Sequence, residues 1–574
     1  MLGVSVAGRV SIAGLAAITL AAIVDPLRLP EKPSFDLIIE SGRIVDGSGN
    51  PWYRADVGVR GGRIVAIGRL KGATALRRID ALERVVAPGF IDLMGSSDWQ
   101  LLVDPRAASK VTQGITLSVA GEGTSVAPAN ERTVEDRASM KRFGVKPDWR
   151  SLADFFRRLE ANPPAIHFAT FVGAGGLRDL VIGRENRPAT PAELAEMQLL
   201  ADEAMRDGAL GVSTSLMYVP HRFASTEEIV ALAKVAARYG GIYATHQRSE
   251  GDGINASLDE VFRIAREAKI PTHIYHLKTM YRQNWGRMPN VLRRIEAARG
   301  EGLDVTASVY PYVAAGAGLF DLLPLWAREG SLDAVLTRLR DPSARERIKK
   351  DLTVSTLEWE NEYYGAGGAE GFLISDVINP SLKPFVGKRL AEVARERGQD
   401  PVDALMDLVV EDKGGTGFVS FIMDEPDVRL ALKQRWAAFC NDSPIQATDG
   451  PLSQGKPHPR AYGSFPRILG RYVREEKLMA LEEAIRKATS LAAQILGVRD
   501  RGLVREGFWA DLVVFDPDKI ADRATFEQPH QYSAGIDFVM VDGELVLDDG
   551  RMTNARPGKV IRGPGYRPAA APGK

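Results

Sequence analysis

This chain of 574 residues contains few cysteines and histidines, and its formal net charge is zero. Cys440 is the only cysteine, which excludes an intrachain disulfide and a thiolate metal cluster. The 74 basic and 74 acidic side chains cancel, so no basic field exists to hold nucleic acid or anionic lipid. Only seven histidines are available as metal ligands. With 45% hydrophobic and 26% charged residues, the composition is that of a globular enzyme or binding protein without a charge-driven partner.

Long apolar runs are also scarce, apart from one near the amino terminus. Residues 10–24 (VSIAGLAAITLAAIV) carry no charge and follow Arg9. This length suits the apolar core of a secretory signal and falls short of the ~20 residues of a membrane-spanning helix. We therefore expect residues 1–30 to be a signal peptide or anchor and the protein to be periplasmic or secreted. Membrane contact is expected only if this segment is not cleaved, and a buried helix in a cytoplasmic protein is the alternative.

Two β-rich blocks enclose a long region of alternating strand and helix signals. Residues 36–51, 55–70, 507–520 and 536–550 alternate apolar and polar side chains around Gly-rich turns, as half-buried antiparallel strands do. Between them, helices are predicted over 191–208, 226–240 and 257–269, with strands over 241–250 and 270–278. Repeated strand–helix units predict an α/β fold with a parallel sheet closed into a barrel. We expect the barrel over 87–485, an insertion around 319–414, a small β-sandwich from 31–86 and 486–562, and a loose tail over 563–574.

The metal-capable side chains stand where predicted strands end, which is where an α/β barrel carries its chemistry. His246 and His276 end consecutive strands, and Glu122 ends an earlier strand between two glycines. Two imidazoles and a carboxylate leave a fourth position open, as in hydrolytic zinc sites. Asp449 is expected to end a late strand and to act as general base. Taken singly, a strand-end histidine is more often structural, and Asp449-Gly450 is more often a turn.

The other histidines carry weaker signals. His273 stands at an odd offset from His276 and is expected to pack outside the barrel. His167, His221 and His530 have no informative spacing and are assigned no metal role.

From about residue 36 to residue 562 the chain resembles the N-acyl-D-amino-acid deacylase (D-aminoacylase) family of the amidohydrolase superfamily. The resemblance rests on scattered motifs in the family's order, including APGFID, GGIYATHQRSEGD, HLKTMYRQNWGRM, VYPYVAAG, TDG, HPRAYGSFPRILGRYV and RGLVREGFWADLVVFDPD. It implies a (β/α)8 TIM-type barrel with a small β-sandwich and an inserted subdomain. It also implies zinc, and hydrolysis of the acyl bond of an N-acyl-D-amino acid or a related small molecule.

The resemblance also assigns roles to single residues. It places the tightly held zinc on Glu122, where many members have cysteine, and on His246 and His276. It places the catalytic aspartate on Asp449. Positions that surround the substrate's carboxylate and scissile carbonyl fall on three further residues, namely Lys278, Tyr310 and Arg460. An arginine binds a carboxylate in bidentate fashion, and a tyrosine hydroxyl stabilises a developing oxyanion.

One feature of the family is missing. Its His-x-His pair, which serves a second and weaker metal position, is replaced by Met94 and Ser96. A thioether and a hydroxyl are poor zinc ligands beside imidazole and carboxylate. Since the first set is complete, we predict a hydrolase with one zinc ion, although the harder carboxylate at Glu122 could also admit another divalent metal. Two alternatives stay open: another hydrolase of the superfamily, such as a dipeptidase or cyclic amidase, and a binding protein that has lost turnover.

Overall fold

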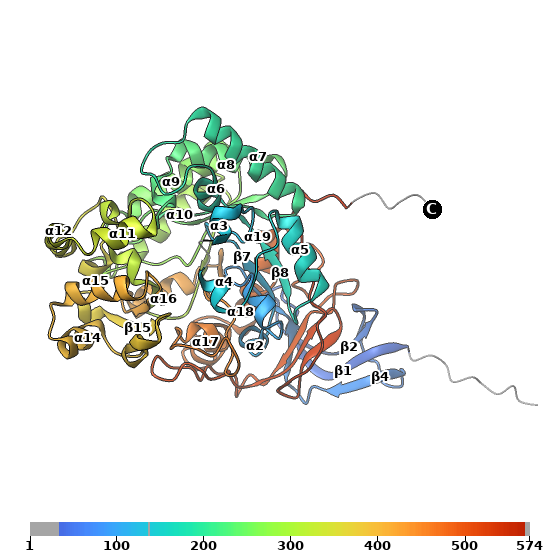
Figure 1. The fold of residues 1–574 in the computed structure, drawn as a ribbon. Coiled ribbons are helices and arrows are strands. Elements are labelled where there is room, and N and C mark those ends of the chain that lie inside the picture. Colours follow the sequence, from blue (N-terminus) through green and yellow to red (C-terminus); the bar gives the residue numbers. More distant parts are fainter. Residues whose placement is uncertain (1–33, 136–137, 569–574) are drawn as a thin grey trace, which may run out of the picture.

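Strands from the two ends of the chain form one sheet in the computed structural model, which describes residues 34–135 and 138–568. The predicted signal peptide lies outside the described residues. The amino-terminal strands are β1 (Phe35–Ile44), β2 (Tyr53–Arg60), β3 (Arg63–Gly68), β4 (Ala75–Asp80) and β5 (Val85–Pro88). The carboxy-terminal strands are β18 (Leu512–Phe515), β19 (Ile536–Val541), β20 (Glu544–Asp548) and β21 (Arg551–Met552). Antiparallel pairing of β5 with β18 joins the two groups, which lie together beside the barrel (Figure 1).

The central region forms the predicted barrel of parallel strands. Its strands are β6 (Phe90–Asp92), β7 (Ile115–Ala120), β8 (His167–Thr170), β9 (Val172–Gly173), β10 (Gly211–Ser215), β11 (Ile242–His246), β12 (Thr272–Ile274), β13 (Val305–Val309) and β17 (Ala437–Phe439). They form two parallel sheets, in the orders β6-β7-β8 and β17-β13-β12-β11-β10-β9. β9 follows β8 after one residue, and the backbone N–H of Asp442 donates to Met94 O at 2.8 Å beyond β17 and β6. These two links close the barrel.

Helices cover the outside of the barrel. They are α5 (Leu152–Ala161), α7 (Pro191–Asp207), α8 (Thr226–Arg238), α9 (Ile254–Ala268), α10 (Met288–Gly300), α16 (Glu425–Leu432) and α18 (Leu481–Ala488). The connections hold α1 (Gln100–Val103), α2 (Ala108–Val111), α3 (Glu131–Glu135), α4 (Ala138–Arg142), α6 (Ala174–Val181), α17 (Arg460–Arg467) and α19 (Ser490–Leu496). A capping box starts α7, since Thr190 Oγ1 accepts from the Glu193 N–H and the Glu193 carboxylate accepts from the Thr190 N–H. Among the described helices, none has both the length and the apolar composition that a membrane crossing requires.

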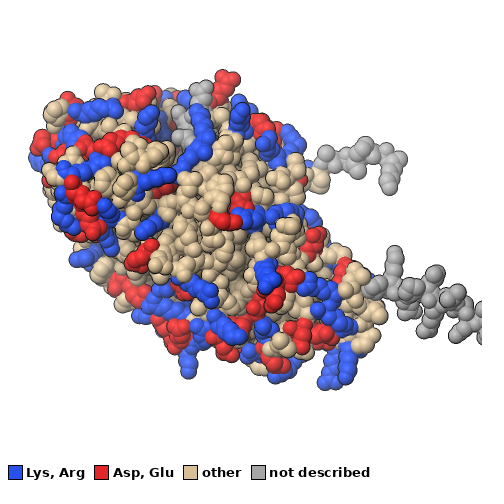
Figure 2. All heavy atoms as spheres, turned by 60° about the horizontal axis from the view of Figure 1, so that its bottom comes forward, with Lys and Arg blue, Asp and Glu red and all other residues tan. Residues whose placement is uncertain are grey.

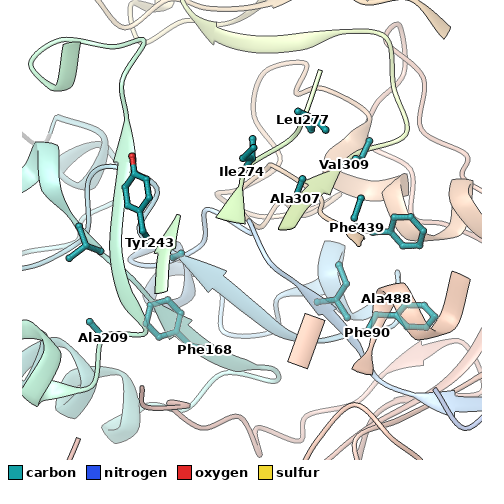
Figure 3. Packing of buried hydrophobic residues seen from close by; sticks show 14 of the residues in the cluster. Phe90, Phe168, Ala209, Tyr243, Ile274, Leu277, Ala307, Val309, Phe439 and Ala488 are labelled. Atoms are coloured by element: carbon teal, nitrogen blue, oxygen red, sulfur yellow. The ribbon is translucent and has the colours of Figure 1, made fainter. Parts of the chain in front are cut away.

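Strand side chains divide between the helices and the barrel interior. Tyr243 and Ile274 belong to the core shared with the outer helices (Figure 3). Tyr275 belongs to a second buried cluster, called the inner cluster here, which also contains Met94 and Tyr310. His273 precedes Ile274, so the alternation of a strand points it inward. Its Nδ1 lies 2.9 Å from Thr306 Oγ1 on the neighbouring strand. The expectation that His273 packs outside the barrel is therefore wrong.

An inserted subdomain interrupts the barrel between β13 and β17. It contains an antiparallel sheet of β14 (Ala315–Gly318), β16 (Gly417–Ser420) and β15 (Phe372–Asp376). Its helices are α11 (Leu332–Arg338), α12 (Pro342–Leu352), α13 (Glu362–Gly365), α14 (Leu390–Arg397) and α15 (Pro401–Glu411). The subdomain lies on the far side of the barrel from β1, β2 and β4 (Figure 1). On the face shown in Figure 2, acidic and basic side chains are interspersed, in keeping with the balanced net charge.

Candidate active site

The three predicted metal ligands meet at the carboxyl ends of the barrel strands. Glu122 Oε1 lies 3.0 Å from His246 Nδ1 and 3.8 Å from His276 Nε2, and the two imidazole centroids are 4.4 Å apart. Ligand atoms about 2.1 Å from one ion, at tetrahedral angles, lie about 3.4 Å from one another. The spacing and the chemistry of the donor set therefore fit a divalent metal such as zinc.

Glycine allows Glu122 to reach this position. Gly123 has a φ of +60°, in the left-handed region that favours glycine. A Cβ at Gly123 would lie 2.4 Å from the Cβ of Ser215 and 2.5 Å from a ring carbon of His221. Ser215 Oγ in turn donates a hydrogen bond of 3.2 Å to Glu122 Oε1. The loop after β7 thus packs directly against the loop after β10, which holds the carboxylate toward the histidines.

Glu250 is a site residue that the sequence did not reveal. It is fully buried, with one oxygen 3.1 Å from His276 Nδ1 and the other 3.4 Å from His246 Nε2. These nitrogens are the ones that do not face Glu122. A carboxylate on the remote nitrogen of a metal-ligating histidine fixes the ring's tautomer and orientation. In the sequence, the only sign of this role was that Glu250 follows His246 by four residues. That spacing brings the two side chains together only because of the path of the loop after β11.

Carboxylates dominate the electrostatics of the cluster. Burial alone would raise the pKa of Glu122, but hydrogen bonds from the two histidines hold that pKa well below its usual range. Burial lowers the pKa of His276, yet Glu250, Asp442 and Glu122 outweigh it and raise that pKa to about 9. Surroundings that stabilise an imidazolium also stabilise a metal cation. The charge of the site, like its geometry, suits a divalent ion.

The three predicted substrate-binding side chains lie beside the metal set. Lys278 Nζ is 2.5 Å from Glu250 Oε2 and 2.8 Å from His276 Nδ1. The Tyr310 ring centroid lies 6.3 Å from that of His276, and Arg460 Cζ sits 4.8 Å from the centroid of the Tyr310 ring. All of these side chains are buried. The cluster therefore offers two cations and a phenol next to the candidate metal position.

Asp449 does not join this cluster. The last barrel strand, β17, ends at Phe439, so the expectation that Asp449 ends a strand is wrong. Its side chain is 64% exposed and forms an ion pair with Arg106, at 2.9 and 3.1 Å. Arg106 also binds Asp104 at 2.8 Å. Asp449 therefore belongs to a surface ion-pair network in this structure.

Asp442 takes the strand-end place that was expected for Asp449. It follows β17 closely, and its side chain is only 12% exposed. Its Oδ2 lies 2.6 Å from Arg460 Nη1, and its charge contributes to the raised pKa of His276, which burial by itself would lower. The sequence offers two aspartates after the strand, in NDSP and TDG. The structure places the first of them in contact with Arg460 of the cluster.

A buried lysine fixes the turn that carries this carboxylate. Lys110 Nζ is fully buried and binds Asp92 Oδ2 at 2.8 Å, Asn441 Oδ1 at 2.9 Å and Ser443 O at 2.7 Å. The Asn441 N–H donates to Asp92 Oδ1 at 2.9 Å. The residues on both sides of position 442 are thereby anchored to β6, through Asp92, and to α2, through Lys110.

The positions of the missing His-x-His pair have other contacts. The Met94 side chain is buried in the inner apolar cluster, and its carbonyl accepts from the Asp442 N–H. Ser96 has a φ of +46°, and its hydroxyl is a weak donor for zinc. Neither residue adds an imidazole or a carboxylate to the Glu122 set.

A second cluster with metal-like spacing joins His167 to Asp511 and Asp542. It lies at the junction of the barrel and the terminal sheet, and it already contains cations. Arg501 Nη2 lies 2.8 Å and Lys559 Nζ 2.6 Å from the Asp542 carboxylate. We therefore interpret it as an ion-pair network that joins the two parts.

Comparison with known proteins agrees with this fold. Residues 77–547 match the amidohydrolase family. The D-aminoacylase of Alcaligenes xylosoxydans xylosoxydans is 38% identical, over 92% of this chain and 98% of its own. A crystal structure of N-acyl-D-glutamate deacylase from Bordetella bronchiseptica, with zinc and a phosphonate inhibitor, is 35% identical, with a TM-score of 0.77 over 92% of this chain and 99% of its own. A D-aminoacylase structure that concerns one-metal activation and second-metal attenuation is 37% identical, with a TM-score of 0.77 over 92% of this chain and 100% of its own.

The fold and the site define a barrel hydrolase of the metal-dependent kind, and the predicted fold class is confirmed. The chain belongs to the amidohydrolase family and, within it, to the N-acyl-D-amino-acid deacylases.

Proposed function

We propose that this protein is a zinc amidohydrolase with one metal ion, which removes the acyl group from N-acyl-D-amino acids. The observation that carries the proposal is the joining of Glu122, His246 and His276 into one donor set next to buried Arg460 and Lys278. A metal-ligand triad supplies hydrolytic chemistry. The two cations suit a substrate that carries a carboxylate. The names of the relatives point to the same substrate class.

The chain's own residues divide the reaction among them. Glu122, His246 and His276 would hold the metal, which when bound supplies Lewis-acid polarisation of the scissile carbonyl and acidifies the attacking water. Arg460 and Lys278 bind the substrate carboxylate, and the Tyr310 hydroxyl donates to the carbonyl oxygen as negative charge develops on it. Asp442 takes a proton from the attacking water and passes it to the leaving nitrogen. The carbon–oxygen bond forms, the carbon–nitrogen bond breaks, and Asp442 returns to its ionised state.

A single metal ion follows from the residues at positions 94 and 96. Met94 and Ser96 supply no strong zinc ligand, so the donor set accounts for one ion. In a related D-aminoacylase, one-metal activation and second-metal attenuation are described, which supports turnover with one ion here. The apolar residues 10–24 support export to the periplasm or the medium as a further part of the proposal.

Release of free amine from a panel of N-acyl-D- and N-acyl-L-amino acids tests the proposed function. We expect turnover of D-substrates that carry a free carboxylate, and weaker turnover of their L-enantiomers. Hydrolysis confined to dipeptides or cyclic amides would contradict the proposal and favour another hydrolase of the family. A zinc-loaded protein that turns over none of these compounds would favour a binding protein.

A further inference from the structure

The guanidinium of Arg460 and the carboxylate of Asp442 bind each other inside the candidate active site. Arg460 begins α17 and is 7% exposed, and its Nη1 lies 2.6 Å from Asp442 Oδ2. Neither Nη1 nor Nε has a hydrogen-bond partner among the described residues, so the contact with Asp442 is an ion pair without hydrogen-bond geometry. A guanidinium presents five N–H donors in a planar fork. Asp442 therefore lies at the Nη1 corner of this fork, which an incoming carboxylate would also contact.

The backbones of the two residues are tied together, so only their side chains are free to change partners. Asn441 Nδ2 donates to the Arg460 carbonyl at 2.6 Å, and the Arg460 N–H donates to His458 Nδ1 at 3.0 Å. The Asp442 N–H is bound to the Met94 carbonyl at 2.8 Å. The geometry of the pair is therefore set by the frame of the barrel and does not depend on a mobile loop.

We infer that Asp442 stays paired with Arg460 until the carboxylate of the substrate binds to Arg460. This binding displaces Asp442 and so frees it for proton transfer. A carboxylate that occupies the fork of Arg460 competes with Asp442 for the same donors, because bidentate binding uses two parallel N–H groups. Once displaced, the Asp442 carboxylate accepts the proton of the attacking water. A neutral compound leaves the Asp442 carboxylate in its ion pair with Arg460. This inference rests on the proposed function.

As a consequence, the enzyme should distinguish substrates with a carboxylate from neutral compounds by kcat as well as by affinity. If Arg460 only bound the substrate, a compound without the carboxylate would bind less well and react at a similar rate once bound. If binding of the carboxylate also frees Asp442, the same compound reacts more slowly even when it saturates the enzyme, because the interaction contributes to the transition state. The ratio of kcat values for matched substrates separates these two cases.

The first experiment measures ligand binding to the zinc-loaded protein by calorimetry. The probe is a ketone analogue of an N-acetyl-D-amino acid, with CH2 in place of the amide NH, and its neutral counterpart is the corresponding carboxamide. We expect Asp442→Asn to bind the carboxylate probe about tenfold or more tightly than the wild type, since a competing charged partner is removed. The carboxamide should show no such gain. The matched control is Asp449→Asn, which alters an exposed Asp–Arg pair and should leave both affinities unchanged.

The second experiment measures kcat on an N-acetyl-D-amino acid and on its neutral carboxamide. In Arg460→Gln, turnover of the carboxylate substrate should fall, while kcat for the carboxamide should rise several-fold above that of the wild type, because Asp442 is no longer paired. Arg460→Gln combined with Asp442→Asn should abolish that rise. Unchanged carboxamide turnover in Arg460→Gln, or unchanged probe affinity in Asp442→Asn, would overturn the inference. If the wild type hydrolyses no amide, the proposed function fails, whereas the calorimetric comparison still decides whether Asp442 and the probe compete for Arg460.

Discussion

Glu250 contacts His276 on the side of the ring that faces away from Glu122, with 3.1 Å between Glu250 Oε1 and His276 Nδ1. Its other oxygen lies 3.4 Å from His246 Nε2. One carboxylate thus orients both imidazoles of the metal set. Loss of such a contact typically weakens metal binding by about 10–100-fold.

Glu250→Gln tests this role through zinc affinity. The amide keeps the size of the side chain but loses its charge, so we expect the zinc affinity to fall by about 10–100-fold. Competition with a chelator measures the affinity, and circular dichroism shows whether the variant is folded. A folded variant with wild-type zinc affinity would mean that Glu250 does not position the ligands.

The metal ligands themselves should behave as a unit. His246→Ala and His276→Ala each remove a strong donor, so zinc content and amide hydrolysis should fall together. Elemental analysis of purified protein and release of free amine measure the two quantities. Either variant would contradict the assigned ligand set if it kept one tightly bound zinc ion per chain and full turnover.

The two aspartates after β17 should differ sharply. Asp442→Asn should keep the metal and lose about 10²–10⁴-fold in kcat, because asparagine cannot accept a proton. Asp449→Asn should stay close to wild type, since an exposed ion pair contributes only about 0–1 kcal/mol. Kinetics and zinc content of both variants provide the check. The reverse result, with Asp449→Asn inactive, would support Asp449 of the TDG motif as the general base.

Glu362 of the insertion should make stability depend on pH. Burial raises its pKa from 4.5 to about 7, although Ser420 donates a hydrogen bond to it. Because the folded-state pKa is the higher one, the folded protein binds more protons in this range, and its stability falls as the pH rises from about 4.5 to 7.

Glu362→Gln should remove that part of the pH dependence. A pKa shift of this size corresponds to at most about 3 kcal/mol of unfolding free energy. Urea unfolding of both proteins at pH 5 and pH 8 measures it. We expect the wild type to lose more stability than Glu362→Gln between these two pH values. Parallel behaviour of the two proteins would show that Glu362 is not held in a neutral form.

The sequence predicted those parts of the site that lie at or just after strands in a clear alternation of strand and helix. β11 ends at His246, and His276 lies two residues beyond the end of β12 (Thr272–Ile274), both within this alternation. β17 (Ala437–Phe439) is as short as β12, but it follows the insertion, where the alternation of strand and helix is interrupted. The loop after β17 contains two aspartates, and TDG is the more familiar motif of the two. Glu250 lies on a loop whose path is set by tertiary packing, so no local pattern could assign it.

Zinc titration of the metal-free protein tests the central claim most directly. Amine release from an N-acyl-D-amino acid is followed as zinc is added, because Glu122, His246 and His276 provide one strong donor set. The account predicts that activity rises to a plateau at one equivalent of zinc per chain. Activity that keeps rising to two equivalents, or full turnover before any zinc is added, would contradict it.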